Sequence, residues 1–202
     1  MSSLLDLIGD QLTGSATQQI SQQLGLDETQ TKTAIAAALP TLLEAVGRQA
    51  ATPDGAQGLH QALAKDHDGS LLDNVAGFFQ GGGGGRAGLG EGILGHILGS
   101  KRQRVEQGVG QMAGVDAATS GKLLSMLAPI VMGALGKQQR QQGFGVDQLT
   151  DFIGKQRQSV ATGDPQSAGI FQKLLDQDGD GDFDVSDMMR LGSSFIGRMF
   201  KK

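Results

Sequence analysis

Apolar residues recur at intervals of three and four along almost the whole chain, and alternating runs of β-branched residues are missing. This spacing places an apolar stripe along a helix, whereas a half-buried strand would show alternation at every second residue. Alanine and glycine abound and the aromatic residues are eight phenylalanines, a composition that favours close packing of helices around a thin core. The sequence therefore predicts an all-α fold.

The same helix-ending and helix-starting signals occur twice, 89 residues apart. In the first copy, Asp27 and Gln30 match a capping box that opens a helix. The shared positions are a glycine, an aspartate and a proline, namely Gly25 with Gly114, Asp27 with Asp116, and Pro40 with Pro129. We predict a duplicated helical unit, and the sequence leaves open whether the two copies pack as one domain or two.

The predicted domain organisation has four parts. Residues 1–79 form the first unit, 80–90 a linker, 91–160 the second unit, and 161–202 a helix-loop-helix. The linker is predicted from five successive glycines, Gly81–Gly85, which have no side chains to pack. A phosphate-binding loop is disfavoured because no strand precedes these glycines and no Lys-Ser or Lys-Thr follows them.

The segment Asp176–Asp187 predicts a calcium loop of the EF-hand type. Such a loop has oxygen ligands at positions 1, 3, 5, 7, 9 and 12 and a glycine at position 6. Gly181 supplies the glycine. The predicted ligands are six aspartates, with the seventh position contributing its backbone carbonyl: Asp176, Asp178, Asp180, Asp182, Asp184 and Asp187. An acidic turn that binds no metal is the alternative.

Two features of this segment bear on the affinity for metal. Asp187 stands where glutamate normally closes the loop, and its shorter side chain predicts weaker binding of Ca²⁺, with Mg²⁺ a possible second ion. The formal charge of the chain is -4, and these six aspartates account for all of the excess acidity. The segment therefore concentrates negative charge where a cation would balance it.

A shorter acidic stretch, Asp66-His67-Asp68-Gly69-Ser70 followed by Asp73, resembles part of the calcium loop but lacks its full ligand set. We predict a turn in which Ser70 caps the next helix, in preference to a second metal site.

Several classes of function are disfavoured. The chain has no cysteine, and none of its three histidines lies beside a recognisable nucleophile motif, so we expect no enzyme activity. Lys101, Arg102 and Arg104 make one short basic run, but no aromatic residues are interleaved with it, and we expect no nucleic-acid binding. The longest apolar stretches are too short to span a membrane. The N-terminal residues lack a basic leader, which predicts a cytoplasmic protein.

Three stretches together resemble the YidB-like bacterial proteins of uncharacterised function. They are Ala38-Leu39-Pro40 with Leu127-Ala128-Pro129, residues 66–73, and the Asp-rich segment that begins at Leu175. The resemblance implies an all-helical bacterial protein, with no activity or site residues to carry over.

The leading hypothesis is a non-enzymatic helical protein in which one calcium loop orders the C-terminal helix pair. The competing hypothesis is a metal-indifferent module for self-association or for binding an unknown protein partner. A third hypothesis, association of the N-terminal helix with a membrane surface, is disfavoured by its acidic residues and lack of lysine.

Overall fold

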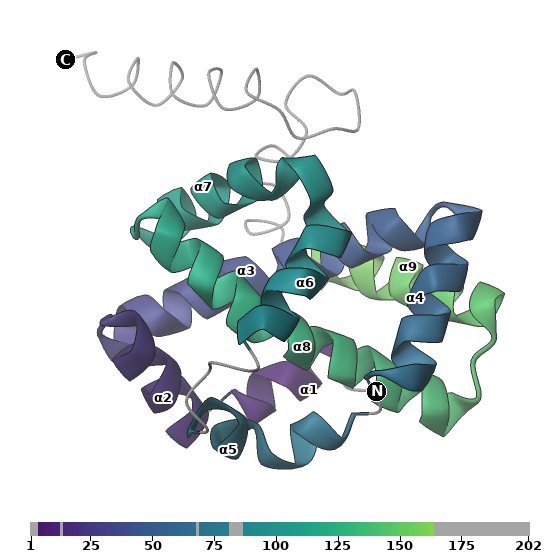
Figure 1. Cartoon of the computed structure of the whole chain (residues 1–202), viewed down its shortest axis with the longest axis horizontal. Coiled ribbons are helices and arrows are strands. Elements are labelled where there is room, and N and C mark those ends of the chain that lie inside the picture. The colour runs from purple at the N-terminus through teal and green to yellow at the C-terminus, as the bar shows by residue number, and fades with distance from the viewer. Residues whose placement is uncertain (1–3, 13, 68, 81–86, 164–202) are drawn as a thin grey trace. The chain divides into compact units, whose positions relative to one another are not determined.

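The computed structural model describes residues 4–12, 14–67, 69–80 and 87–163, which form helices and no strands (Figure 1). The predicted all-α class is confirmed for these residues. In chain order the helices are α1 (Leu4–Gln11), α2 (Ser15–Leu24), α3 (Glu28–Ala50), α4 (Pro53–Lys65), η1 (Ser70–Asn74), α5 (Val75–Gln80), α6 (Ala87–Leu98), η2 (Gly99–Lys101), α7 (Arg102–Ala113), α8 (Ala117–Gln142) and α9 (Val146–Gly163).

Residues 1–157 form one compact unit, and a second unit begins at Gln158. Both predicted helical copies, 1–79 and 91–160, contribute to the first unit, where α3 of one copy packs against α8 of the other. The predicted helix-loop-helix, 161–202, falls almost entirely outside the described residues.

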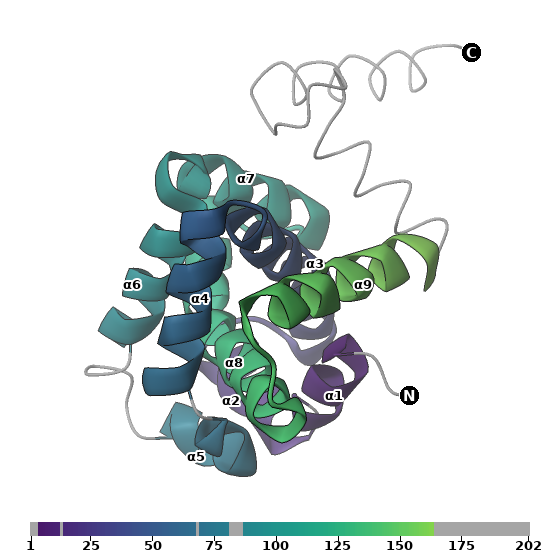
Figure 2. The ribbon, with the colours of Figure 1, turned by 90° about the vertical axis from the view of Figure 1, so that its right-hand side faces the viewer.

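Helix α8 forms the centre of the first unit. It contacts α1, α2, α3, α4, α6, α7 and η1, and in Figure 2 α4 and α6 lie on one side of it while α1 lies on the other. Its large apolar side chains include some of the most buried in the unit, namely Leu123, Leu124, Leu127, Ile130 and Leu135. Burying one such side chain contributes about 1.5–3 kcal/mol, so this helix provides much of the stability of the core.

The paired positions of the predicted duplication have matching local structures. Gly25 and Gly114 end α2 and α7 in the left-handed conformation, with φ of 66° and 68°. The side chains of Asp27 and Asp116 cap α3 and α8, each accepting a hydrogen bond from the backbone N–H three residues later. At Asp27 the predicted capping box with Gln30 is confirmed. The duplication itself stays a prediction.

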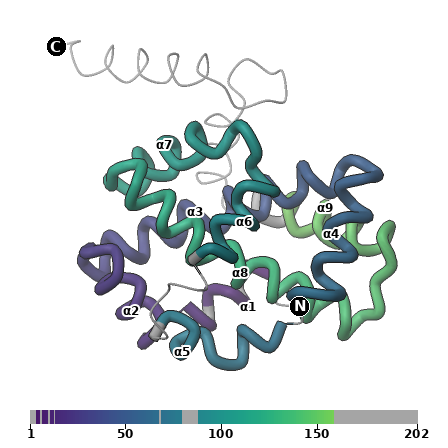
Figure 3. Tube along the Cα trace, viewed as in Figure 1, coloured from purple at the N-terminus to yellow at the C-terminus, as the bar shows by residue number. Residues whose placement is uncertain are grey.

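The glycines Gly47 and Gly136, also 89 residues apart, lie on α3 and α8, whose paths through the unit Figure 3 shows. Each of the two glycines has a close neighbour from another part of the chain. A Cβ at Gly136 would lie 1.7 Å from the backbone oxygen of His67, and one at Gly47 would lie 2.2 Å from Cδ of Arg157. The guanidinium of Arg157 then donates hydrogen bonds of 2.6 and 2.5 Å to the two carboxylate oxygens of Glu44. Glycine at position 47 therefore allows α9 to be held against α3.

Helix α6 begins at Ala87, so the last four residues of the predicted linker, 80–90, lie in a helix. One of them, Gly90, packs closely on α8, because a Cβ there would lie 1.9 Å from the backbone oxygen of Ser125. Three other glycines of α6, namely Gly88, Gly92 and Gly95, are exposed, and a Cβ added at any of them would meet no atom within 4 Å. A close neighbour therefore excludes a larger residue at only one of these four positions, Gly90.

Two glycine-to-alanine substitutions in α6 test this packing. We expect Gly90→Ala to lower the free energy of unfolding by about 1–3 kcal/mol, because the methyl group must displace the backbone of α8. Gly92→Ala, the matched control, should raise the free energy of unfolding by about 0.5–1 kcal/mol through higher helix propensity. Urea unfolding measures both, and changes of the same sign would contradict the packing of α6 on α8.

Candidate functional site

All six predicted calcium ligands, from Asp176 to Asp187, lie outside the described residues. Within the described ranges no group of three or more His, Asp or Glu side chains is arranged to hold a metal ion. The structure therefore supplies no metal centre in the helical part of the chain that it describes, and the site that its geometry does form lies elsewhere.

That site is built around the acidic stretch that follows α4. Gly69 has φ of 86°, a left-handed conformation that suits glycine, and it turns the chain into η1. The prediction that Ser70 caps the next helix is wrong, because Ser70 is already the first residue of η1. The cap of α5 is instead Asn74, whose Oδ1 accepts a hydrogen bond from the N–H of Gly77 at 2.8 Å.

The turn before η1 lies directly on α8, and glycines on both sides permit the close approach. The backbone oxygen of His67 lies over Gly136, as described above. A Cβ at Gly69 would lie 2.7 Å from Cβ of Lys137 and 3.1 Å from the backbone oxygen of Gly133. His67 and Gly69 are therefore held against α8 by backbone packing, and Lys137 adds a 3.4 Å ion pair with Asp73.

A cavity of about 490 Å³ opens beside this turn, and we call it the η1 cavity. Its volume falls in the range of small-molecule sites, roughly 300–1,000 Å³. Residues from the turn, η1, α5, α6 and α8 line it: Asp66, His67, Gly69, Ser70, Leu71, Asn74, Gly77, Phe78, Leu89, Pro129 and Gly133. The sequence reasoning found the turn and the proline separately, but it gave no sign that they share a cavity.

His67 and Asp66 are the two titratable side chains in the described lining of the η1 cavity. Burial of the imidazole lowers the pKa of His67, against the weaker and opposite influence of nearby Asp66. The ring is therefore neutral at pH 7, and among the described lining residues Asp66 is the one that carries a formal charge. Asp66 is exposed, so its carboxylate is open to solvent at the edge of the cavity.

Leu89 forms part of the apolar wall of the η1 cavity and is 48% exposed. Among the described residues it is the one large hydrophobic side chain with such exposure. The other three large apolar lining residues, Leu71, Phe78 and Pro129, come from η1, α5 and α8 and are less exposed. The described lining thus combines an apolar wall with the carboxylate of Asp66.

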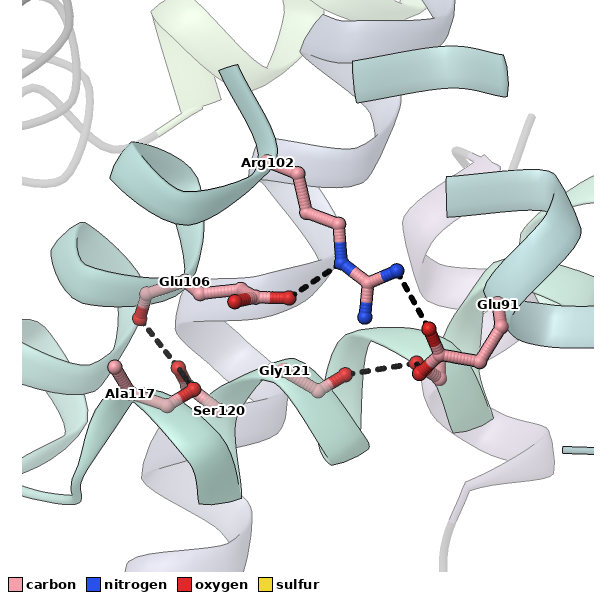
Figure 4. Close-up of polar contacts among 7 residues, drawn as sticks. Glu91, Arg102, Glu106, Ala117, Ser120 and Gly121 are labelled. Atoms are coloured by element: carbon pink, nitrogen blue, oxygen red, sulfur yellow. Dashed lines mark hydrogen bonds and ion pairs between the residues drawn. The ribbon is translucent and has the colours of Figure 1, made fainter. Parts of the chain in front are cut away.

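A second polar cluster joins α6, α7 and α8 (Figure 4). The guanidinium of Arg102 contacts Glu91 at 2.5 Å and donates a hydrogen bond to Glu106 at 2.6 Å. Ser125 donates a hydrogen bond of 2.7 Å to the other oxygen of Glu91. The carboxylate of Glu106 lies over Gly121, where a Cβ would be 2.8 Å from Oε1. The polar groups of this cluster therefore satisfy one another.

These contacts shift the acid-base behaviour of the cluster. The hydrogen bond from Arg102, followed by that from Ser125, lowers the pKa of Glu91. The hydrogen bonds to Glu91 and Glu106 raise the pKa of Arg102. Both shifts favour the charged forms, so the cluster acts as a clamp between helices.

Arg140, a basic residue of α8, also has a contact within the chain. Its guanidinium donates a hydrogen bond of 3.2 Å to the backbone oxygen of Ala64.

The prediction that the longest apolar stretches are too short to span a membrane needs correction at α8. Among the described helices α8 is the one long and apolar enough to cross a membrane by length and composition, and most of its apolar window is buried here against other helices.

Comparison with known proteins places most of this helical part in one family. Residues 6–138 match the model of a family described as bacterial protein of unknown function (DUF937), a family that includes YidB. No curated protein and no solved structure matches the chain. The matched residues include both the acidic stretch before η1 and Pro129, but the match ends before the predicted calcium loop.

The clamp at Arg102 predicts a pH-dependent contribution of Glu91 to stability. Because the pKa of Glu91 is lowered by folding, its contribution is fully present above its ordinary pKa of 4.5 and is lost as the pH falls through the lower folded-state pKa. We expect Glu91→Gln to lower the urea midpoint at pH 7 and to have much less effect near pH 3. Glu28→Gln, which removes an exposed pair with Lys32, is the control and should change little at either pH. An equal loss from Glu91→Gln at both pH values would contradict this role.

Proposed function

The chain belongs to this bacterial family of unknown function, and on that premise we propose that it is a non-enzymatic, cytoplasmic helical protein whose C-terminal segment binds calcium. The observation that carries the proposal is the match of residues 176–187 to every ligand position of a calcium loop. The helical part, 4–157, would be the scaffold to which this segment is joined through α9.

The chemistry of the segment supports calcium over other ions. All of its side-chain donors are carboxylate oxygens, which suit hard cations, and it contains no histidine or cysteine for zinc or copper. Six negative charges in twelve residues also repel one another unless a cation is bound. We propose that calcium orders this loop and its flanking segments as a structural clip, with magnesium as a weaker competitor.

The shorter closing side chain of Asp187 sets the expected affinity. A closing aspartate must bring the exit segment closer to the ion for both of its oxygens to bind, which weakens the site. We expect a dissociation constant of about 10⁻⁴ M or weaker, in the range of structural and extracellular modules. A dissociation constant of about 10⁻⁷ to 10⁻⁵ M would instead indicate a sensor.

Calorimetric titration of the chelator-stripped full chain with calcium, then magnesium, tests the proposal. We expect one calcium site that is lost in Asp176→Ala and in Asp187→Ala. Asp151→Ala removes the same charge from an exposed position on α9 and should bind calcium like the parent chain. Helicity and melting of the calcium-free variants should match those of the calcium-free parent, because the substitutions lie outside the helical unit.

The same samples distinguish calcium binding from the competing function, a metal-indifferent module for self-association or partner binding. That function is favoured by the η1 cavity and the exposed Leu89. It predicts no binding heat, and a molecular mass and melting temperature that are the same with calcium and with chelator. A calcium-dependent rise in melting temperature that Asp176→Ala abolishes would count against it.

A further inference from the structure

Two stretches that lie far apart in the sequence meet at the η1 cavity. One is the acidic stretch that begins at Asp66, and the other is the part of α8 around Pro129 and Gly133. Both fall within the residues that match the family model. Helices α5 and α6 complete the cavity with Phe78 and Leu89, so five separate segments contribute to one lining.

The position of Asp66 is not explained by the needs of the fold. Asp66 is the C-cap of α4, and a negative charge there faces the negative end of the helix dipole. A neutral or basic residue would suit the helix better. Residues that disfavour their own secondary structure in this way often have a functional role instead. Here the carboxylate is exposed at the edge of a cavity with an apolar wall.

We propose that the η1 cavity binds an organic cation, with an ammonium or guanidinium group at Asp66 and an apolar body against Leu71, Phe78 and Leu89. Among the described lining residues Asp66 supplies a negative charge at the rim, and the neighbouring His67 is neutral and adds no positive charge to oppose a cation. An anion would meet this carboxylate, and the described part of the lining holds no lysine or arginine to balance it. The cation can come from the lysine or arginine side chain of a partner, or from a free amine.

Size and chemistry together narrow the ligand further. A cavity of about 490 Å³ has room for a body of phenyl or branched-alkyl size beside its charged group. The glycines Gly77 and Gly133 keep two parts of the lining free of side chains. The exposed face of Leu89 then gives the body an apolar contact at the mouth of the cavity.

Three probes with the same phenyl body and different end groups test the proposal by NMR on the full chain. They are 2-phenylethylammonium, 2-phenylethanol and 3-phenylpropionate, titrated in the presence of chelator. We expect 2-phenylethylammonium to shift the amide signals of residues 66–78, 89 and 130–133. The alcohol should bind about five-fold more weakly, the effect of one partly exposed ion pair. The carboxylate should bind more weakly still.

Matched variants assign the effect to individual side chains. Asp66→Asn should weaken binding of the ammonium probe by about five-fold and leave the alcohol unchanged. Asp54→Asn, at the other end of α4, removes the same charge and should leave both probes unchanged. Leu89→Ser should weaken both probes. Asp66→Asn and Leu89→Ser alter exposed side chains, and unchanged spectra away from the cavity confirm that both variants are folded.

The outcomes are distinct from those of the calcium proposal. The site is supported by shifts confined to the cavity and sensitive to Asp66, whatever happens at residues 176–187. It is overturned if the carboxylate probe binds as well as the ammonium, if Asp54→Asn and Asp66→Asn have the same effect, or if the NMR signals of the cavity residues do not move.

A fourth probe, the blocked dipeptide Ac-Phe-Lys-NH₂, identifies the source of the cation. Tighter binding of this dipeptide than of 2-phenylethylammonium would assign the cation to a partner side chain, and the reverse order would assign it to a free amine.

Discussion

The described fold depends on how closely other segments approach the backbone of α8. Gly90 of α6 lies on the backbone oxygen of Ser125, and the backbone oxygen of His67 lies on Gly136. These contacts leave no room for a single methyl group, so they fix the position of each segment as well as its burial. A core of leucines alone would supply stability but tolerate sliding, whereas contacts at the backbone specify one arrangement.

Polar interactions are arranged around these close contacts. The pair of Arg157 with Glu44 lies beside Gly47, and the carboxylate of Glu106 lies over Gly121. At Gly47 the glycine admits Arg157 of α9, which forms an ion pair with Glu44 of α3. Glu106 pairs with Arg102 of its own helix α7, and Arg102 in turn forms the ion pair with Glu91 of α6. The two interhelical pairs are partly exposed, and they gain their value from geometry, because each one joins two helices.

Local signals in the sequence predicted what is determined locally. The capping box at Asp27 and the left-handed glycines at Gly25 and Gly114 depend on a few neighbouring residues, and the helical periodicity on somewhat longer stretches.

The errors of prediction arose where residues distant in the sequence decide the structure. Ser70 belongs to a 3₁₀ turn that packs on α8, and Gly90 of α6 packs on Ser125 of α8, neither of which the neighbouring sequence reveals. The η1 cavity could not be predicted for the same reason, since five segments form it. The predicted calcium loop stays a prediction, because its residues lie outside those that the structure describes.

The exposed glycines of α6 have a consequence for the local stability of this helix. Gly88, Gly92 and Gly95 each make the isolated helix less stable by roughly 1 kcal/mol relative to alanine, so α6 has little tendency to form alone. Its helical state must come from Gly90, Leu94 and Leu98, which bury against the rest of the unit. Helix α6 therefore depends on its packing against α8 for its helical state, and its amide hydrogens should exchange with solvent through a lower-energy local opening than those of α8.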